Sequence, residues 1–480
     1  MMIFENRSWK LALALLVALG LARNIWAQGP EPTPPPKPAG RAVPVIGDAT
    51  QDTNSEQESA AGWNSDTMPL TGLQSPTIGN PGFRHSYVVP GFQYGSTVQE
   101  IPNAGPQSGN WYANNYLGAN LSLLQQRSHS QMTLNVSAGG FVTNQPGQKD
   151  GWYQQLAFNQ NFSWRRWQMQ FLDQFAYLPG TQFGFGAGTG LSSPGILGPL
   201  GPSVPGISGS VVPNQNNFAS IGPQYSNSFV TQITYQTSPR GSFTVGGSDG
   251  LLRFTQSGNV DSDTYIGNVG YNYQLTKIDT IGLFYRFAAY HYDGNPQAIA
   301  DHILNFVYGR KITRRLAFQI TGGPDLTNYR VPLGNQKRTV SGSGGANLTY
   351  AFQNGSISAN YFHGVSGGSG ILVGSSTDNS TLTATRRLTR VWGVQSNFGV
   401  ARNKALADAV GAQGSNYNSI FVGGGFNRPI GRELNLSFAY QAQIQQQNAT
   451  ICTGPACNTS YTQNIVTVNL QWHSRPFVLE

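Results

Sequence analysis

The stretch Ser228–Thr237, SFVTQITYQT, alternates between two kinds of side chain. Its large apolar residues Phe229, Ile233 and Tyr235 fall on one face of an extended chain, because successive side chains of a β-strand point to opposite faces. Ser228, Gln232, Thr234 and Gln236 fall on the other face. The stretch therefore predicts a β-strand with one apolar face and one polar face that carries no charge.

The same alternation recurs over segments of about ten residues along the rest of the chain. Three further segments are clear examples, and the last of them lies close to the C-terminus. They set Tyr265, Val269, Tyr271 and Tyr273 against Asn268, Asn272 and Gln274; Leu434, Leu436, Phe438 and Tyr440 against Asn435, Ser437, Gln441 and Gln443; and Val466, Val468, Leu470 and Trp472 against Thr467, Asn469 and Gln471.

The composition excludes several classes of protein. Charged residues make up 10% of the 480 residues, whereas an ordinary soluble protein has about 25%. Aromatic residues make up 11%, and disordered chains have few. The longest apolar run, Leu11–Ala22, is shorter than the about 20 residues of a membrane-spanning helix. The chain is therefore predicted to be rich in β-structure, with polar but uncharged surfaces.

Short and long connections alternate along the predicted strands. Tight turns are expected near residues 127, 165, 239, 277, 312, 354, 388 and 430, with longer connections between them. An up-and-down transmembrane β-barrel has short turns at one rim and long loops at the other, whereas a β-sandwich does not need this order. The sequence therefore predicts an all-β, antiparallel, closed transmembrane barrel over residues 83–480.

The number of strands follows from the same connections. Seventeen are counted from Tyr116 to the C-terminus, and the first connection after Tyr116 is a short turn. Since both ends of such barrels lie on the short-turn side, one strand should precede, and Phe92–Glu100 is the candidate. This gives 18 strands. The alternative is 16, if two weaker segments around Gly246 and Leu372 are loops.

The N-terminal region is predicted to consist of two segments outside the barrel. Arg7 and Lys10, the apolar run after them and the small residue Ala27 are typical of a secretory signal peptide over residues 1–27. Residues 28–82 hold a proline-rich spacer and a polar stretch, and we expect a largely disordered periplasmic leader.

Three tight turns place basic residues directly before an alternating strand, in KITRRLAF, RLTRVWGV and PIGRELNL. Together with the signal peptide, the proline-rich leader and the alternating strands, they resemble a Gram-negative outer-membrane β-barrel. The turns resemble more loosely the barrel porins found with exopolysaccharide loci. The resemblance implies an integral outer-membrane location, with membrane lipid and the barrel-assembly machinery as partners. The last strand departs from the pattern because it lacks a glycine and residues 474–480 follow Trp472.

Residues on the polar face are the candidates for lining a lumen. Arg286 alternates with Leu283, Tyr285 and Phe287 and is expected to point inward, close to Asp301 on the next strand. This pair could set the field of a constriction or could neutralise itself. Asp173 breaks the pattern between two phenylalanines, which predicts either a bulge or a different register there. The full set of pore-lining candidates is Arg286, Asp301, Asn268, Asn272, Gln441 and Gln443.

The sequence offers few residues that could form a catalytic or metal-binding site. The six histidines have no metal-ligand spacing, and His291, Asp293, Asp301 and His302 around one hairpin are interpreted as rim residues, so no enzyme activity, metal or cofactor is expected. The only cysteines, Cys452 and Cys457, are expected to form a disulfide in an exported chain. Basic residues lie singly in turns, so nucleic acid is not an expected partner despite the net charge of +8.

The longest connection, residues 178–223, carries no charge and is rich in glycine and proline. It is expected either to fold into the lumen as a constriction or to form a surface flap. The leading function is passive passage of small hydrophilic solutes, with Arg286 tilting selectivity weakly towards anions. The alternatives are a conduit or assembly component for exopolysaccharide export, with a glycan as partner, and a structural or adhesive barrel without an open pore. The oligomeric state stays open.

Overall fold

The computed structural model describes residues 86–101, 110–144, 149–178, 224–255, 260–293, 298–313, 315–330, 336–368, 373–389, 391–406, 416–431, 433–448 and 460–479. The predicted signal peptide, leader, Cys452–Cys457 disulfide and long connection after residue 178 lie outside these residues. No described residue belongs to a helix long and apolar enough to cross a membrane.

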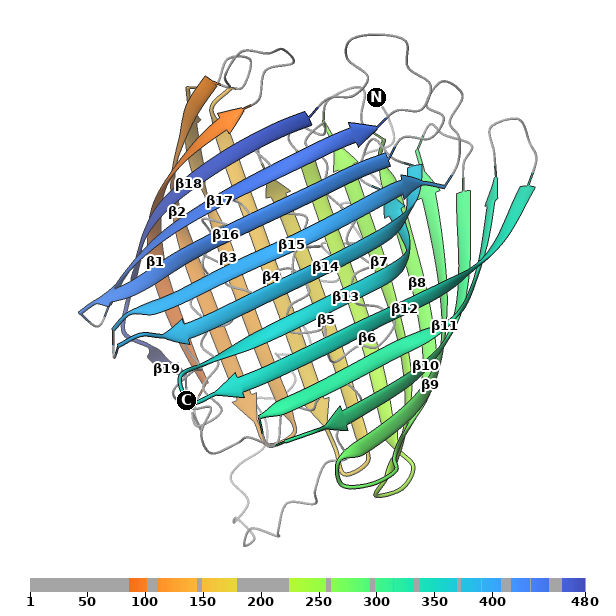
Figure 1. The fold of residues 1–480 in the computed structure, drawn as a ribbon. Helices are drawn as coiled ribbons and strands as arrows, with labels where there is room; N and C mark the ends of the chain where they lie inside the picture. The colour runs from red at the N-terminus through yellow and green to blue at the C-terminus, as the bar shows by residue number, and fades with distance from the viewer. Residues whose placement is uncertain are drawn as a thin grey trace, which may run out of the picture. The chain divides into compact units, whose positions relative to one another are not determined.

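The described residues form a single antiparallel β-sheet that closes on itself (Figure 1). Each strand from β1 to β17 pairs with the next one in the chain, and β1 pairs with β2 on one edge and with β18 and β19 on the other. The predicted all-β antiparallel barrel is therefore confirmed. The strands are β1 (Ser86–Ile101), β2 (Asn110–Arg127), β3 (Ser130–Thr143), β4 (Gly151–Ser163), β5 (Trp167–Leu178), β6 (Gln224–Gln236), β7 (Gly241–Phe254), β8 (Ser262–Gln274), β9 (Asp279–Tyr292), β10 (Ala298–Lys311), β11 (Leu316–Arg330), β12 (Gln336–Phe352), β13 (Gly355–Gly368), β14 (Val373–Arg387), β15 (Gly393–Ala405), β16 (Asn416–Ile430), β17 (Leu434–Asn448), β18 (Ser460–His473) and β19 (Phe477–Leu479).

The predicted count of 18 strands, with 16 as the alternative, is wrong, because the described residues form 19. The additional strand is β19, which lies beyond the last segment in which the sequence alternates. After β18 the Ser474 N–H still donates to the carbonyl of Pro90 at 2.9 Å, but Pro476 has no N–H to give to the ladder. Pairing then resumes, so β18 and β19 occupy successive parts of the same edge of β1.

Short and long connections alternate as predicted. All eight predicted tight turns join consecutive strands, from β2–β3 to β16–β17, and the strand predicted over Phe92–Glu100 lies within β1. Gly246 lies inside β7, so that segment is a strand and not a loop. The short turns therefore gather at one rim of the barrel, called here the turn rim, and the longer connections at the other, called the loop rim.

Threonine hydroxyls organise three of the tight turns. In the turn between β10 and β11, the Thr313 Oγ1 accepts hydrogen bonds from the backbone N–H groups of Arg315 and Leu316 at 3.2 and 3.0 Å. Thr276 and Thr389 accept the equivalent pairs of hydrogen bonds in the turns before β9 and β15. Short side chains of this kind favour turns because they satisfy backbone donors locally. The basic residues of these turns are thereby carried at the rim.

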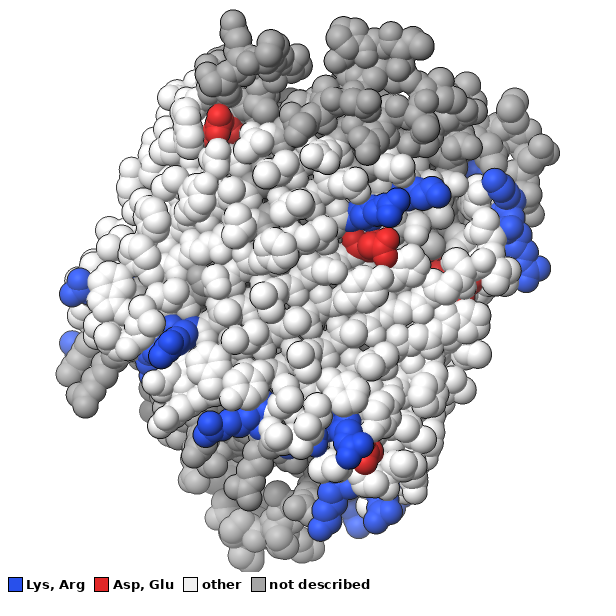
Figure 2. All heavy atoms as spheres, in the orientation of Figure 1, with Lys and Arg blue, Asp and Glu red and all other residues white. Residues whose placement is uncertain are grey.

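The two faces of the sheet have inverted polarity relative to a soluble protein. On β1, Phe92 is 58% exposed and points outward, whereas its neighbour Gln93 is 1% exposed and points inward. The alternation continues around the barrel, so large apolar side chains cover the outside and polar ones line the inside. Figure 2 shows the same division on one face, where Lys and Arg gather towards the two rims and leave a broad uncharged band between them.

Candidate functional site

The interior of the barrel is the candidate site, because buried polar side chains converge there from most of the strands. Arg286 on β9 and Asp301 on β10 both point inward, as predicted, and form an ion pair of 2.6 Å between Nη2 and Oδ2. Their side chains are 4% and 0% exposed. The pairing of β9 with β10 sets Asp301 opposite Ala288, two residues from Arg286, so the contact runs diagonally across two strands.

A second carboxylate lies beside this pair. Asp325 on β11 is buried and interacts electrostatically with Asp301 and with Arg286. Thr327 Oγ1 lies between the two acids, 3.0 Å from the Oδ1 of Asp325 and 3.5 Å from the Oδ1 of Asp301. Arg286 therefore faces two carboxyl groups, so the structure does not support the expected tilt towards anions. Asp325 and Thr327 were not among the predicted residues.

The outer end of the β13–β14 hairpin lies against the inner face of β9. Tyr292 Oη donates a hydrogen bond to the carbonyl of Gly367 at 2.6 Å, and Tyr290 Oη donates to the carbonyl of Val365 at 3.4 Å. Four strand positions separate β9 from β13, so these bonds link parts of the wall that do not neighbour each other in the sheet. They narrow the interior near the loop rim.

An apolar cluster surrounds this contact, inside an otherwise polar interior. Its members come from β5, β6, β8, β9, β10, β11 and β13, and all except Val365 occupy inward positions where the alternation would place a polar residue. They are Leu172, Val230, Ile266, Ala288, Tyr290, Tyr292, Ile299, Tyr329 and Val365. The members other than Val365 are visible in the sequence, because they interrupt the polar face of their strands.

Many inward polar groups have no protein partner within the described part of the chain. Five asparagines have a buried side-chain amide whose nitrogen and oxygen make no hydrogen bond to the described residues: Asn114, Asn120, Asn272, Asn397 and Asn469. A buried amide without a partner costs about 1–3 kcal/mol, so a wall built this way is suited to contact with water or a polar solute.

The remaining predicted residues are placed as follows. Asn268 and Asn272 on β8 and Gln441 on β17 are buried on the inward face. Gln443 lies in β17, and its side chain is outside the described part. The four residues His291, Asp293, Asp301 and His302 are not brought together, since Asp301 points inward while His302 contacts the Tyr285 hydroxyl at 2.8 Å on the outer face.

Asp173 has an environment that neither predicted explanation describes. Strand β5 pairs with β4 and β6 without a bulge, and its register places Leu172 inward and Asp173 outward. Asn227 Nδ2 on β6 donates to the Asp173 Oδ1 at 3.0 Å. The register was therefore read correctly, and the carboxylate is accommodated on the outer face by this hydrogen bond.

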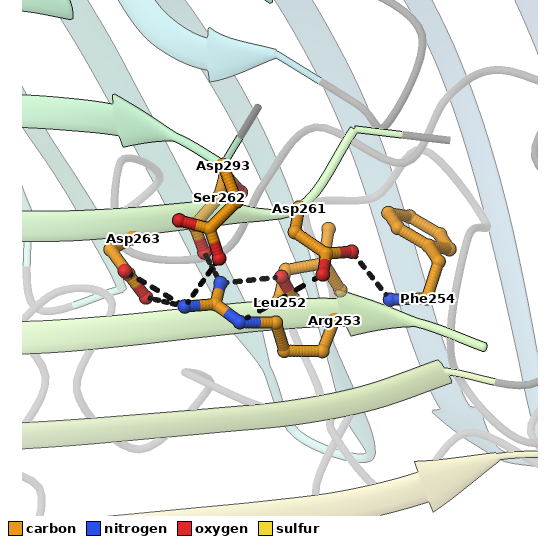
Figure 3. A network of polar contacts seen from close by, with 7 residues as sticks. All are labelled: Leu252, Arg253, Phe254, Asp261, Ser262, Asp263 and Asp293. Carbon is orange, nitrogen blue, oxygen red and sulfur yellow. Dashed lines mark hydrogen bonds and ion pairs between the residues drawn. The ribbon is translucent and has the colours of Figure 1, made fainter. Parts of the chain in front are cut away.

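A separate charged network joins β7, β8 and β9 at the loop rim (Figure 3). Arg253 Nη2 lies 2.7 and 2.8 Å from the two carboxylate oxygens of Asp263 and 3.3 Å from Asp293. Its Nε is 3.9 Å from Asp261, which also accepts a hydrogen bond from the Phe254 N–H at 2.8 Å. One guanidinium thus ties together the ends of three strands. Among the described residues, no group of three or more His, Cys, Asp or Glu side chains could hold a metal ion.

Comparison with known proteins gives a likeness of fold only. No protein-family model matches the chain, and no curated protein matches it. Among solved structures, the chain is similar to Pseudomonas aeruginosa OpdQ, with 9% identity, a TM-score of 0.42, and coverage of 82% of this chain and 98% of that one. It is similar to OccK9 (OpdG) of the same organism, with 11% identity, a TM-score of 0.43, and coverage of 81% and 98%. It is also similar to the outer membrane protein OpdK of that organism, with 9% identity, a TM-score of 0.41, and coverage of 81% and 99%.

Proposed function

We propose that this chain is an integral outer-membrane β-barrel channel for the passive passage of small hydrophilic solutes. The observation that carries the proposal is the inverted polarity of the wall, with apolar side chains exposed outside and polar ones buried inside on the same strands. A continuous exposed apolar surface of this extent needs a partner of matching polarity. A lipid bilayer supplies it around a closed barrel, whose backbone groups are paired within the sheet.

The chemistry of the interior supports neutral polar solutes as the substrate class. Asn, Gln, Ser and Thr dominate the buried polar residues, and their unpartnered amides can hydrogen-bond a solute in place of water. Barrels of about 16–18 strands leave an aqueous channel instead of a packed core. Within this proposal Arg286, Asp301, Asn268, Asn272, Gln441 and Gln443 line the pathway, and Asp325 and Thr327 join them.

The proposal also covers segments outside the described residues. Residues 1–27 would direct export and residues 28–82 would remain in the periplasm, with lipid and the barrel-assembly machinery as partners. Cys452 and Cys457 would form a disulfide in the connection between β17 and β18. Nothing in the described residues or the comparisons favours export of exopolysaccharide, and we do not propose it.

Osmotic swelling of proteoliposomes tests the proposal. Liposomes holding the refolded full-length chain should swell in isotonic solutions of small neutral sugars, with rates that fall as the sugar grows. Empty liposomes and a version lacking residues 179–223 serve as references. Swelling only with the shortened version would indicate that this connection closes the pore, and no swelling with either folded version would contradict a channel and favour a structural barrel.

A further inference from the structure

The wall of the barrel is split between β12 and β13 near the loop rim. Pairing of these strands runs from Phe352–Gly355 to Gly344–His363 and ends there. Beyond this point β12 stays paired with β11 out to Gln336, and β13 stays paired with β14 out to Gly368. Residues 336–343 and 364–368 therefore each have one strand edge without a strand partner among the described residues. In Figure 1 the loop-rim ends of β11 and β12 lie apart from those of β13 and β14.

Local sequence explains why the two strands separate. On β12 the separation begins within SGSGG (341–345), and the unpaired segment of β13 reads GVSGG (364–368). Glycine and serine pack weakly in a sheet, so little holds the two edges together. Instead of β12, the hydroxyls of Tyr290 and Tyr292 bind this part of β13, by donating hydrogen bonds to the carbonyls of Val365 and Gly367. The inward bend of β13 is thus stabilised by contacts to β9 and not by β12.

The split lies at membrane depth if the chain spans the membrane, and this inference rests on that proposed function. Gly344 is eight residues from the turn-rim end of β12 at Phe352. At about 3.3 Å per residue and a tilt of about 45°, the split begins about 19 Å above that end, within an apolar band about 25 Å tall. Unpaired backbone at this depth is tolerated only where it lines a cavity or is covered by protein.

An apolar groove on the outer face leads up to the split. It has a volume of about 510 Å³, within the range of about 300–1,000 Å³ typical of ligand pockets. Ala346 and Tyr361 form a cross-strand pair in this groove, two residues below the last pair, Gly344 and His363. Small side chains such as Ala346 and Ala359 leave room, and Leu348, Leu382 and Phe398 supply apolar walls.

Apolar surface continues on the inner side of the split. Val365, on the unpaired edge of β13, belongs to the inner apolar cluster with Tyr290, Ile299 and Tyr329. On the other edge, Val340 of β12 lies on the outward face and is 71% exposed. An apolar groove outside and an apolar cluster inside therefore lie on the two sides of this separation of β12 from β13.

Basic side chains flank the split at the loop rim. Arg338 on β12 and Arg402 and Lys404 on β15 are exposed and occupy outward positions, and Figure 2 shows Lys and Arg gathered there on the front face. Acidic charge near them is limited to Asp378, whose Oδ1 lies 2.7 Å from the His363 Nδ1. On the inner side, the Lys337 Nζ lies 5.9 Å from the centre of the Tyr329 ring. The charges on the outer side of the split favour an anion, whereas the inner side also carries Asp301 and Asp325, which interact electrostatically with Tyr290.

We propose that the split between β12 and β13 is a lateral opening that binds a long-chain anionic amphiphile and passes it between the outer leaflet and the lumen. The hydrocarbon part occupies the outer groove and then the inner cluster around Tyr290 and Val365. The anionic head contacts Arg338 and Arg402 outside and Lys337 inside. The tyrosine hydroxyls hold the edge of β13 away from β12.

A photoreactive long-chain fatty acid tests the proposal in proteoliposomes of the full chain. Photolysis should give saturable adducts both in the outer groove, on the peptide containing Ala346 and Leu348, and in the lumen, on Tyr329 or Val365. The paired substitution Ala346→Trp with Ala359→Trp fills the groove and should reduce lumen adducts about tenfold. Ala138→Trp, on the outer face of β3, is the matched control and should change nothing.

Charge and specificity are tested in the same vesicles. Arg338→Glu with Arg402→Glu should weaken binding of the fatty acid about tenfold while leaving the corresponding photoreactive fatty alcohol unchanged. Sugar-driven swelling measured in parallel separates this proposal from the proposed function, since the groove and charge variants should still swell. Adducts confined to the groove, adducts in the lumen that survive the filled groove, or unchanged binding of the fatty acid by the charge variant would overturn the lateral opening.

Discussion

Arg286 and Asp301 lie on neighbouring strands, 15 residues apart in the chain, and meet inside the barrel at 2.6 Å with almost no exposure of either side chain. Asp325 and the Thr327 hydroxyl complete their surroundings. Removing one partner of a buried ion pair leaves the other uncompensated, which costs about 3–5 kcal/mol, whereas removing both costs much less. This arrangement makes the pair sensitive to single substitutions and gives it a direct influence on ions in the lumen.

Asp301→Asn should shift ion selectivity towards anions, because it adds one positive charge to the lumen around Arg286. Arg286→Gln should shift it towards cations. The measurement is the reversal potential in a gradient of potassium chloride across a planar bilayer. The double variant should return close to the original selectivity, and Arg253→Gln, at the outer rim network, should leave it unchanged. Shifts of the same sign in the two single variants would show that the pair does not act through its charge.

Tyr292→Phe should loosen the outer end of the β13–β14 hairpin. The variant removes the 2.6 Å hydrogen bond to the Gly367 carbonyl, worth about 1–2 kcal/mol, so amide exchange in residues 364–368 should accelerate about tenfold. Tyr290→Phe should have a smaller effect, since its bond is 3.4 Å long. Mass spectrometry of deuterated peptides provides the readout. Tyr440→Phe on the outer face is the control, and equal exchange in all three variants would contradict the contact.

Thr276→Val, Thr313→Val and Thr389→Val should each lower the free energy of unfolding by about 0.5–1.5 kcal/mol, because each removes a hydroxyl that accepts two turn hydrogen bonds. The effect of Thr389→Val should add to the others because its turn lies four strands away, whereas the Thr276 and Thr313 turns are joined by the hydrogen bond from the Lys311 N–H to the Ile278 carbonyl and should be coupled. Urea unfolding in lipid vesicles measures them. The corresponding serine variants keep the hydroxyl and should stay close to the original stability. Valine and serine variants that are equally stable would show that the hydroxyls do not organise the turns.

Asp173→Leu combined with Asn227→Leu should raise the free energy of unfolding in lipid. Replacing a pair of polar partners by apolar residues of similar volume is often stabilising by about 1–4 kcal/mol, and here the new side chains would face lipid. Asn227→Leu alone should be destabilising, because the carboxylate loses its 3.0 Å hydrogen bond. A double variant that is less stable than the single one would mean that this face does not contact lipid.

Most of the architecture could be predicted from the sequence because barrel strands carry a period of two and the connections alternate in length. Phe229 and Gln232 already identify the two faces of β6, and both lie as expected, exposed and buried. The number of strands could not be derived in the same way. Strand β19 is three residues long with all three exposed, so it has no alternation to detect.

The site was predicted less completely. The contact between Arg286 and Asp301 could be predicted, because it depends only on the alternation of each strand and on a hairpin near residue 295, which are local features of the sequence. Asp325, by contrast, lies on the next strand after another connection, next to Pro324 and two glycines that obscure the register. The contact of Tyr292 with Gly367 spans four strand positions, and no local pattern reports which strands face each other across a lumen.

The central claim is that the barrel encloses a water-filled pathway across a membrane. Single-channel recording of the refolded full-length chain in planar bilayers tests this most directly. We predict steady conductance steps that scale with salt concentration and that keep their size in Arg253→Gln but change their ion selectivity in Asp301→Asn. A correctly folded barrel that inserts into the bilayer and gives no conductance, with or without residues 179–223, would contradict the account.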